Sequence, residues 1–154
     1  MSFLPEYSKF AELFAAEKLE ITSEQYSQLE TYARLLVEWN EKINLTAILD
    51  PEGIAVKHFL DCLMIFKYVD IPFGASVIDI GTGAGFPGLA LKIAYPNLQV
   101  TLLDSLNKRI KFLNEVIDRL ELNDITAIHG RAEDFAKEKN YFSLLKDKLS
   151  QWSL

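Results

Sequence analysis

Cysteine is almost absent from this chain of 154 residues, because Cys62 is the only one. One thiol can neither close an internal disulfide nor supply a cysteine-rich metal site. The sequence also lacks any apolar run near the ~18 residues that a membrane-spanning helix needs. Its amino-terminal residues show no basic region followed by an apolar stretch, so they are unlike a secretory signal peptide. These absences predict a cytoplasmic protein with no membrane segment and no metal site.

Positive charge is also scarce. The chain has 16 lysine and arginine residues against 22 aspartate and glutamate residues, which gives a formal net charge of −6. A negative balance counts against a nucleic-acid partner, because phosphate binding usually requires a basic face. It does not exclude one, since net charge says little about local patches. Hydrophobic residues make up 49% of the chain, which is enough to build the core of one domain.

The first 70 residues have the periodicity of helices. A short amphipathic helix follows Pro5, and Thr22 with Gln25 forms a capping-box pattern ahead of a second helix. Asp50 and Pro51 fit the N-cap and the first position of a third helix. The apolar stripes of these three helices consist of Tyr7, Phe10, Leu13, Phe14, Tyr26, Leu29, Ala33, Leu36, Val37, Phe59, Cys62, Leu63 and Phe66.

The pattern changes after Pro72 and Gly74. Short apolar or β-branched runs at 76–80, 100–103 and 125–128 predict three strands. A helical segment at 88–95 separates the first two strands, and an amphipathic helix separates the second from the third. The stripe of that second helix consists of Leu106, Ile110, Leu113, Ile117 and Leu120. Strands that alternate with helices predict an α/β fold with a parallel sheet.

A glycine-rich loop follows the first predicted strand. Gly81, Gly83 and Gly85 give the spacing G-x-G-x-G, with Phe86 next and Asp79 two residues before the first glycine. Glycines open backbone conformations that other residues avoid, and they let a ligand approach the bare main chain. A dinucleotide site has the spacing G-x-G-x-x-G, whereas this pattern resembles motif I of methyltransferases that use S-adenosyl-L-methionine (AdoMet). AdoMet carries a positive sulfonium and an ammonium, so an acid beside the loop is electrostatically favourable.

Two further candidate binding segments follow the next two strands; these two and the glycine loop are called the three stations of the site. Asp104 ends the second strand, where a carboxylate can accept both ribose hydroxyls of a nucleoside. Ala132 and Glu133 follow the third strand, at a place that borders the adenine in AdoMet-dependent methyltransferases. Each station alone has a simpler explanation: a tight turn, a helix cap at Asp104 or a first-turn acid at Glu133. Their order and spacing together favour one crevice at the carboxyl ends of the strands, where open α/β sheets bind ligands.

Four segments carry a more specific resemblance. They are V-I-D-I-G-T-G-A-G-F-P-G at 77–88, L-L-D-S-L-N-K-R-I-K-F-L at 102–113, W-N-E-K-I-N-L-T at 39–46 and K-H-F-L-D at 57–61. From about residue 5 to about residue 136, the chain resembles the bacterial 16S ribosomal RNA guanine-N7 methyltransferase family, also called glucose-inhibited division protein B. The resemblance implies AdoMet contacts at Gly81, Phe86, Ala132 and Glu133, with Asp104 toward the ribose. It also implies methyl transfer to N7 of a guanine, with 16S rRNA or the small ribosomal subunit as partner.

Two alternatives stay open, a catalytically dead AdoMet-binding fragment and a nucleotide-dependent oxidoreductase that uses the same loop. Guanine N7 carries a lone pair and no proton, so methyl transfer requires alignment rather than a base, and the sequence assigns no catalytic residue. His58 is interpreted as a helix histidine satisfied by a neighbour such as Asp61. The segment 39–46 is expected to pack over the cofactor loop. Candidate RNA contacts, which a solvated charged face explains equally, are Lys108, Arg109, Lys111 and Arg131.

The resemblance divides the chain into a helical cap at 1–70, the first half of an AdoMet-binding domain at 71–137 and a divergent tail at 138–154. The predicted fold class is α/β: the first half of a Rossmann-like AdoMet-dependent methyltransferase sheet, with an N-terminal helical extension. Because no linker separates the first two parts, we expect the cap to pack beside the sheet. In the tail, Ser143 stands where the family has an aspartate, and we expect the catalytic half to be missing. The strand at 77–80 would then be an exposed apolar edge that promotes self-association.

Overall fold

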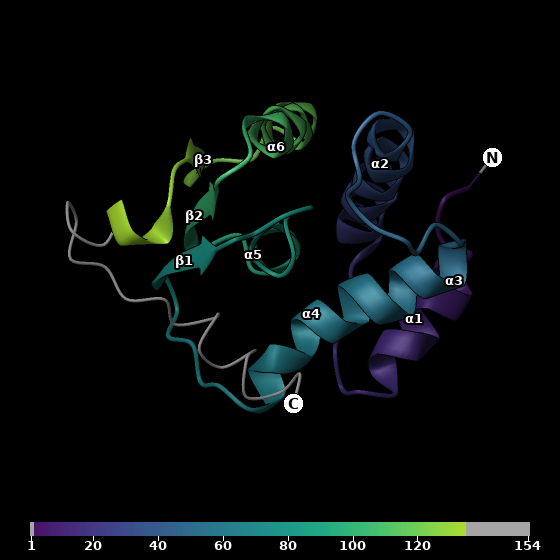
Figure 1. The fold of residues 1–154 in the computed structure, drawn as a ribbon. Coiled ribbons are helices and arrows are strands. Elements are labelled where there is room, and N and C mark those ends of the chain that lie inside the picture. Colours follow the sequence, from purple (N-terminus) through teal and green to yellow (C-terminus); the bar gives the residue numbers. More distant parts are fainter. Residues whose placement is uncertain (1, 135–154) are drawn as a thin grey trace.

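The computed structural model describes residues 2–134 (Figure 1). Helices occupy the first half of this part, and strands alternate with helices in the second half. The elements are α1 (Tyr7–Ala15), α2 (Ser23–Asn40), α3 (Pro51–Gly53), η1 (Ile54–Leu60), α4 (Asp61–Leu63), η2 (Met64–Lys67), β1 (Ser76–Ile80), α5 (Gly88–Ala94), β2 (Gln99–Asp104), α6 (Asn107–Arg119) and β3 (Ile125–His129).

Local side-chain hydrogen bonds set where two of the helices begin. The Thr22 hydroxyl accepts from the Gln25 backbone N–H at 3.1 Å, and the Gln25 side chain accepts from the Thr22 N–H at 3.0 Å. This reciprocal pair is the capping box that the sequence predicts at the start of α2. Asp50 caps α3 by accepting from the Gly53 N–H at 2.8 Å, with Pro51 at the first helical position. Both predicted caps are confirmed.

The third predicted helix is continuous but irregular. From Pro51 to Lys67 the winding changes from α to a π-helix (η1), back to α and then to a 3-10 turn (η2). A π-helix is wider than an α-helix and is often found at functional sites. The apolar stripe survives this change, because Phe59, Cys62 and Leu63 are buried and Phe66 packs against the core. The predicted third helix and its buried stripe are therefore confirmed, and the change in winding is an addition from the structure.

The three strands form one parallel sheet in the order β1-β2-β3. Val77 pairs with Val100, and Val100 pairs with Ile125, so the strands run side by side without a shift. This arrangement confirms the predicted α/β fold, the first three strands of a Rossmann-like sheet. Because all three strands run the same way, their carboxyl ends meet at one edge of the sheet.

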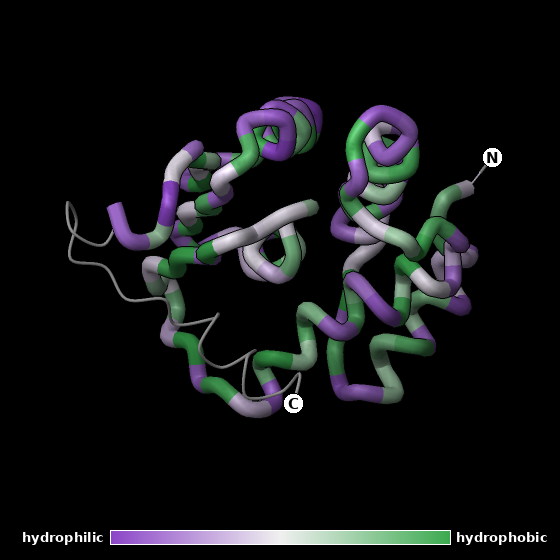
Figure 2. Tube along the Cα trace, in the orientation of Figure 1, coloured by the Kyte–Doolittle hydropathy of each residue, from purple (hydrophilic) through white to green (hydrophobic). Residues whose placement is uncertain are grey.

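The helices form two layers on one side of the sheet (Figure 1). Helices α5 and α6 contact the strands, while α2 and α4 pack against α5, and α2 also contacts α6. One continuous cluster of buried side chains joins these layers and extends from Leu4 to Val116. Figure 2 shows α2 and α6 with both hydrophilic (purple) and hydrophobic (green) turns, as expected for helices with one buried side. The N-terminal helices thus share their core with the sheet.

Two residues that open predicted stripes are exposed instead of buried. Tyr7 has 38% of its surface exposed and Leu106 has 50%. Both lie at helix starts, and Leu106 is in an extended conformation ahead of α6, so it points away from the stripe that begins at Ile110.

The apolar edge expected on β1 also needs correction. Val77 and Ile78 are only 3% and 4% exposed, although β1 is the outer strand of the described sheet.

None of the helices within residues 2–134 combines the length and the apolar character needed to cross a membrane. The predictions for 138–154, which concern a divergent tail, Ser143 and the loss of the catalytic half, fall outside the described residues.

Candidate functional site

A crevice of about 490 Å³ opens at the carboxyl ends of the three strands. The structure brings together residues from all three predicted stations, which are far apart in the sequence. The residues that line the crevice are Ile80, Gly81, Leu103, Asp104, Ser105, Gly130, Arg131, Ala132 and Glu133. This is where open α/β sheets bind ligands. Of the seven predicted cofactor-binding residues, four lie on this lining and three, Gly83, Gly85 and Phe86, do not.

The glycine loop leaves β1 in a conformation that favours glycine. Gly81, Gly83 and Gly85 have φ values of +70°, +61° and +97°, in the left-handed region. The backbone N–H groups of Gly81 and Thr82 both donate to the Leu103 carbonyl, at 2.8 and 3.0 Å. The loop is therefore fastened to the end of β2 before it turns into α5.

The glycines of the loop face different surroundings. A β-carbon at Gly83 would meet no atom within 4 Å, so this position borders open space. A β-carbon at Gly85 would lie 2.5 Å from the Tyr32 hydroxyl and 2.9 Å from Leu89. Gly85 is thus needed for the close approach of the loop to α2. Gly85 does not line the crevice, and its predicted contact with a cofactor stays a prediction.

Asp79 joins the two ends of the loop. Its side chain is fully buried, and Oδ2 accepts from the Thr82 hydroxyl at 2.7 Å and from the Gly88 N–H at 2.9 Å. The sequence predicts that this acid favours the positive charges of AdoMet. The structure gives it a second task, because it holds the first turn of α5 against the start of the loop.

Asp104 connects the loop to α6. Its carboxylate is 3% exposed; Oδ2 accepts from the Gly83 N–H at 2.8 Å and Oδ1 accepts from the Leu106 N–H at 2.9 Å. Arg109 lies 3.5 Å from the same carboxylate. The capping alternative is therefore partly observed, since Asp104 satisfies a backbone donor ahead of α6. Arg109, a candidate RNA contact, turns inward to this ion pair.

The Phe86 ring lies against the N-terminal helices instead of on the crevice lining. It stacks on the His58 imidazole, with ring centroids 4.4 Å apart and planes at 15°. His58 Nε2 is 2.7 Å from the Thr46 hydroxyl, so its hydrogen-bond partner is Thr46 and not the expected Asp61. Burial lowers the pKa of His58, against a smaller opposing effect of Asp61. The segment 39–46 thus reaches the loop through His58.

Tyr32 is the residue that the sequence does not single out. Its side chain is fully buried in α2, and its hydroxyl donates to the Ala84 carbonyl at 2.5 Å. Burial raises the pKa of this phenol well above its ordinary value, so it stays a protonated donor. Its position between Leu29 and Leu36 indicates burial, but nothing local indicates the partner of the hydroxyl.

The remaining charged candidates lie at the surface. Lys108 and Lys111 are exposed on α6, and Arg131 is exposed at the rim of the crevice. Within residues 2–134, no cluster of three or more histidine, cysteine, aspartate or glutamate side chains is arranged to hold a metal ion.

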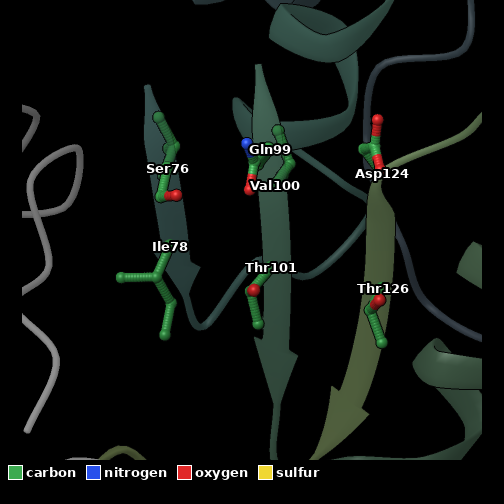
Figure 3. A pocket seen from close by; sticks show the side chains of 8 residues that line it. Ser76, Ile78, Gln99, Val100, Thr101, Asp124 and Thr126 are labelled. Atoms are coloured by element: carbon green, nitrogen blue, oxygen red, sulfur yellow. The ribbon is translucent and has the colours of Figure 1, made fainter. Parts of the chain in front are cut away.

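A second hollow of about 280 Å³ lies nearer the amino ends of the strands (Figure 3). Figure 3 shows Ser76, Thr101 and Thr126 on three adjacent strands, with Asp124 at the start of β3. None of the predicted stations contributes to this hollow. The crevice at the carboxyl ends is therefore the better candidate for a cofactor.

Comparisons of the sequence point to one family. The family model of GidB, rRNA small subunit methyltransferase G, matches residues 25–146. The ribosomal RNA small subunit methyltransferase G of Desulforamulus reducens is 54% identical over 129 residues, which cover 82% of this chain and 54% of that protein. The protein of the same name from Clostridium beijerinckii is 55% identical over 120 residues, which cover 78% and 50%. The chain spans about half the length of the curated relatives it matches.

Solved structures give weaker overlaps. A SAM-dependent methyltransferase from Aquifex aeolicus has a TM-score of 0.43 and 24% identity, over 53% of this chain and 43% of that one. A Plasmodium falciparum protein-L-isoaspartate O-methyltransferase homologue in complex with S-adenosyl-L-homocysteine has a TM-score of 0.46 and 18% identity, over 82% and 63%. The sequence match decides the assignment, because the family model covers most of the chain: it belongs to the rRNA small subunit methyltransferase G family.

Proposed function

We propose that this chain binds AdoMet in the crevice at the carboxyl ends of β1, β2 and β3. We propose further that this cofactor donates a methyl group to N7 of a guanine in 16S rRNA. The observation that carries the proposal is the convergence of Gly81, Asp104 and Glu133 from three successive strands on one crevice. Any three parallel strands bring their ends to one edge, so the types of residue that meet there, a glycine loop and two acids, are what favour a cofactor site. Membership of the family supports an rRNA substrate and a cytoplasmic location as parts of this proposal.

The residues present fit the parts of AdoMet. The open space beside Gly83 lets a ligand approach the main chain of the loop. Asp104 would accept the ribose hydroxyls, because a carboxylate has more acceptor sites than the Gly83 and Leu106 N–H groups occupy. Ala132 and Glu133 would border the adenine, since they line the far side of the crevice. Bound AdoMet would supply an activated methyl group.

The chemistry requires little from titratable side chains. Guanine N7 attacks through a lone pair and carries no proton, so the reaction needs no general base. The task of the protein is to align the methyl group with N7 and to exclude other orientations. A rigid glycine loop, fastened to Leu103 and to Asp104, serves that alignment.

RNA binding needs positive charge close to the crevice despite the net charge of −6. Arg131 at the rim and Lys108 and Lys111 on α6 are the exposed candidates. We propose that they contact phosphates of the substrate, and Arg109 less so because it pairs with Asp104. Charge-neutralising variants should then reduce RNA affinity with a shallower dependence on salt.

Calorimetric titration with AdoMet and, separately, with NAD tests the cofactor. We expect AdoMet to bind and NAD not to bind. Asp104→Asn should weaken AdoMet by about 1.5–3 kcal/mol, the range for a hydrogen bond to a charged group. Gly83→Val should abolish binding by filling the open space beside the loop. Tighter binding of NAD than of AdoMet would refute the cofactor and support an oxidoreductase.

Transfer of a labelled methyl group to small-subunit rRNA, taken from cells that lack their own enzyme, tests the reaction. Transfer to guanine N7 supports the proposed activity. AdoMet binding without any transfer by this chain supports the alternative, a catalytically dead AdoMet-binding fragment. Transfer to another atom or another RNA would contradict the substrate while leaving the cofactor assignment intact.

A further inference from the structure

The Phe86 ring is enclosed by three aromatic side chains of the N-terminal helices. His58 stacks on it at 4.4 Å, while Tyr32 and Phe59 have ring centroids 5.8 and 6.2 Å away. His58 is the nearest of the three and the most parallel, with an interplanar angle of 15° against 38° for Tyr32 and 67° for Phe59. An offset or parallel ring contact of this kind fixes the plane of a neighbouring ring as well as its distance.

His58 is itself held from its other side by a polar chain. Its Nε2 lies 2.7 Å from the Thr46 hydroxyl. The Thr46 and Leu45 N–H groups both donate to Asn40 Oδ1, at 2.9 and 2.8 Å. Asn40 is the last residue of α2, so a continuous series of contacts runs from this helix through Thr46 to the imidazole ring.

Phe86 has a direct effect on the glycine loop. It follows Gly85 without a break, and its N–H donates to the Thr82 carbonyl at 3.2 Å, which closes the loop before α5 begins. A shift of the Phe86 ring would therefore move the backbone of the loop. Both His58 and Phe59 contact Phe86 although they are consecutive residues, and they lie in the wide π-turn of η1.

We propose that His58 is a positioning residue for the cofactor loop: stacked on Phe86 and oriented by Thr46, it holds the loop in the conformation that binds AdoMet. This inference rests on the proposed function, because it concerns the same crevice. His58 does not itself line the crevice, so it acts through Phe86. A role in filling space alone would not need a hydrogen-bonded ring, since a phenylalanine would serve equally.

Three variants separate the two contacts of His58. His58→Ala removes the stack and the hydrogen bond, Thr46→Val removes only the hydrogen bond, and His58→Phe keeps a ring but cannot bond to Thr46. We expect His58→Ala to raise the AdoMet dissociation constant about tenfold, as the loss of an aromatic pair implies. His58→Phe should recover part of this loss, and Thr46→Val should show an intermediate loss of about threefold.

Phe66→Ala is the matched control. Phe66 lies in η2, in the same continuous helical segment as His58, and packs against Tyr95 with ring centroids 3.9 Å apart. Among the ring contacts of the described residues, none joins Phe66 to the loop. This variant should lower the unfolding temperature and leave the AdoMet dissociation constant within about twofold of the wild type. Equal affinities of wild type, His58→Ala and Thr46→Val, or an equal loss in Phe66→Ala, would overturn the inference.

Proton NMR first checks the stack on Phe86, and the response of the His58 signals to AdoMet is then a readout that a purely structural role would not move. The chain has two histidines, so His129→Gln assigns the imidazole signals. We expect the His58 ring signals to be shifted upfield by Phe86, to return toward ordinary values in Phe86→Leu and to change during AdoMet titration. Ordinary shifts in the wild type, or no change with saturating AdoMet, would contradict the positioning role. If the wild type binds no AdoMet, the proposed function fails as well, whereas binding that ignores His58 refutes this inference alone.

Discussion

The buried hydroxyl of Tyr32 gives a sharp test of how the N-terminal helices support the glycine loop. Tyr32→Phe removes one oxygen atom and leaves the ring. The lost bond is the donation to the Ala84 carbonyl at 2.5 Å, between a side chain that is 0% exposed and a residue that is 4% exposed. No water reaches such a site easily, so the carbonyl would lose its donor in a buried position.

The magnitude follows from that burial. A buried polar group left without its partner costs about 1–3 kcal/mol, whereas a typical intramolecular hydrogen bond contributes a net ~1 kcal/mol to stability. For a chain of this size each kcal/mol lowers the unfolding temperature by roughly 2–4 °C. We therefore expect Tyr32→Phe to unfold on the order of 5 °C below the wild type. The AdoMet dissociation constant should also rise, because Ala84 lies between two glycines of the loop.

Tyr26→Phe is the matched control for this prediction. The Tyr26 hydroxyl donates to the Pro5 carbonyl at 2.6 Å, in a partly buried site remote from the loop. Its loss should lower stability by a smaller amount and leave AdoMet affinity unchanged. Thermal unfolding followed by circular dichroism, together with calorimetric titration, measures both effects. A Tyr32→Phe variant as stable as the wild type, or a Tyr26→Phe variant that binds AdoMet equally weakly, would refute the reasoning.

Three more predictions concern other parts of the fold. Thr22→Ala should lower the free energy of unfolding by about 1 kcal/mol in urea titration, because the capping box of α2 is lost; an unchanged midpoint would contradict this. Burial raises the pKa of the Cys62 thiol well above its ordinary value of 9.0. Iodoacetamide at pH 8 should then react only after unfolding, and the stabilising effect of the neutral thiol should be complete below pH 9 and decline at higher pH. We also expect that β1 does not drive self-association, because Val77 and Ile78 on this outer strand are only 3% and 4% exposed; a dimer in sedimentation velocity at high concentration would refute it.

Local patterns in the sequence predict most of the backbone. The capping box at Thr22, the N-cap at Asp50 and the three apolar strand runs depend on neighbours within a few residues, and all of them are confirmed. The convergence of the strand ends then follows from parallel alternation, which is why the crevice could be predicted without coordinates.

Contacts between distant segments could not be predicted in this way. Tyr32 reaches a partner 52 residues away, and its hydroxyl leaves no trace in the periodicity of α2. The same limit applies to the hydrogen-bond partner of His58. The sequence suggests Asp61, because it is three residues away, whereas the partner in the structure is Thr46 from the preceding loop. The π-helical winding of η1, where His58 and Phe59 contact Phe86, likewise has no local sign in the sequence.

Because the core described above is continuous, we expect the crevice and the N-terminal helices to unfold as one thermodynamic unit. A ligand present at 100 times its dissociation constant stabilises the state that binds it by about 2.7 kcal/mol. Because Phe10 and Phe14 in α1 belong to the same buried cluster as Leu102 and Leu113, that free energy is shared by helices that never touch the ligand. Amide hydrogens in α1 and α2 would then exchange more slowly with solvent when a ligand fills the crevice. Ligand binding at the strand ends would thus lower the exchange rates across all the described residues.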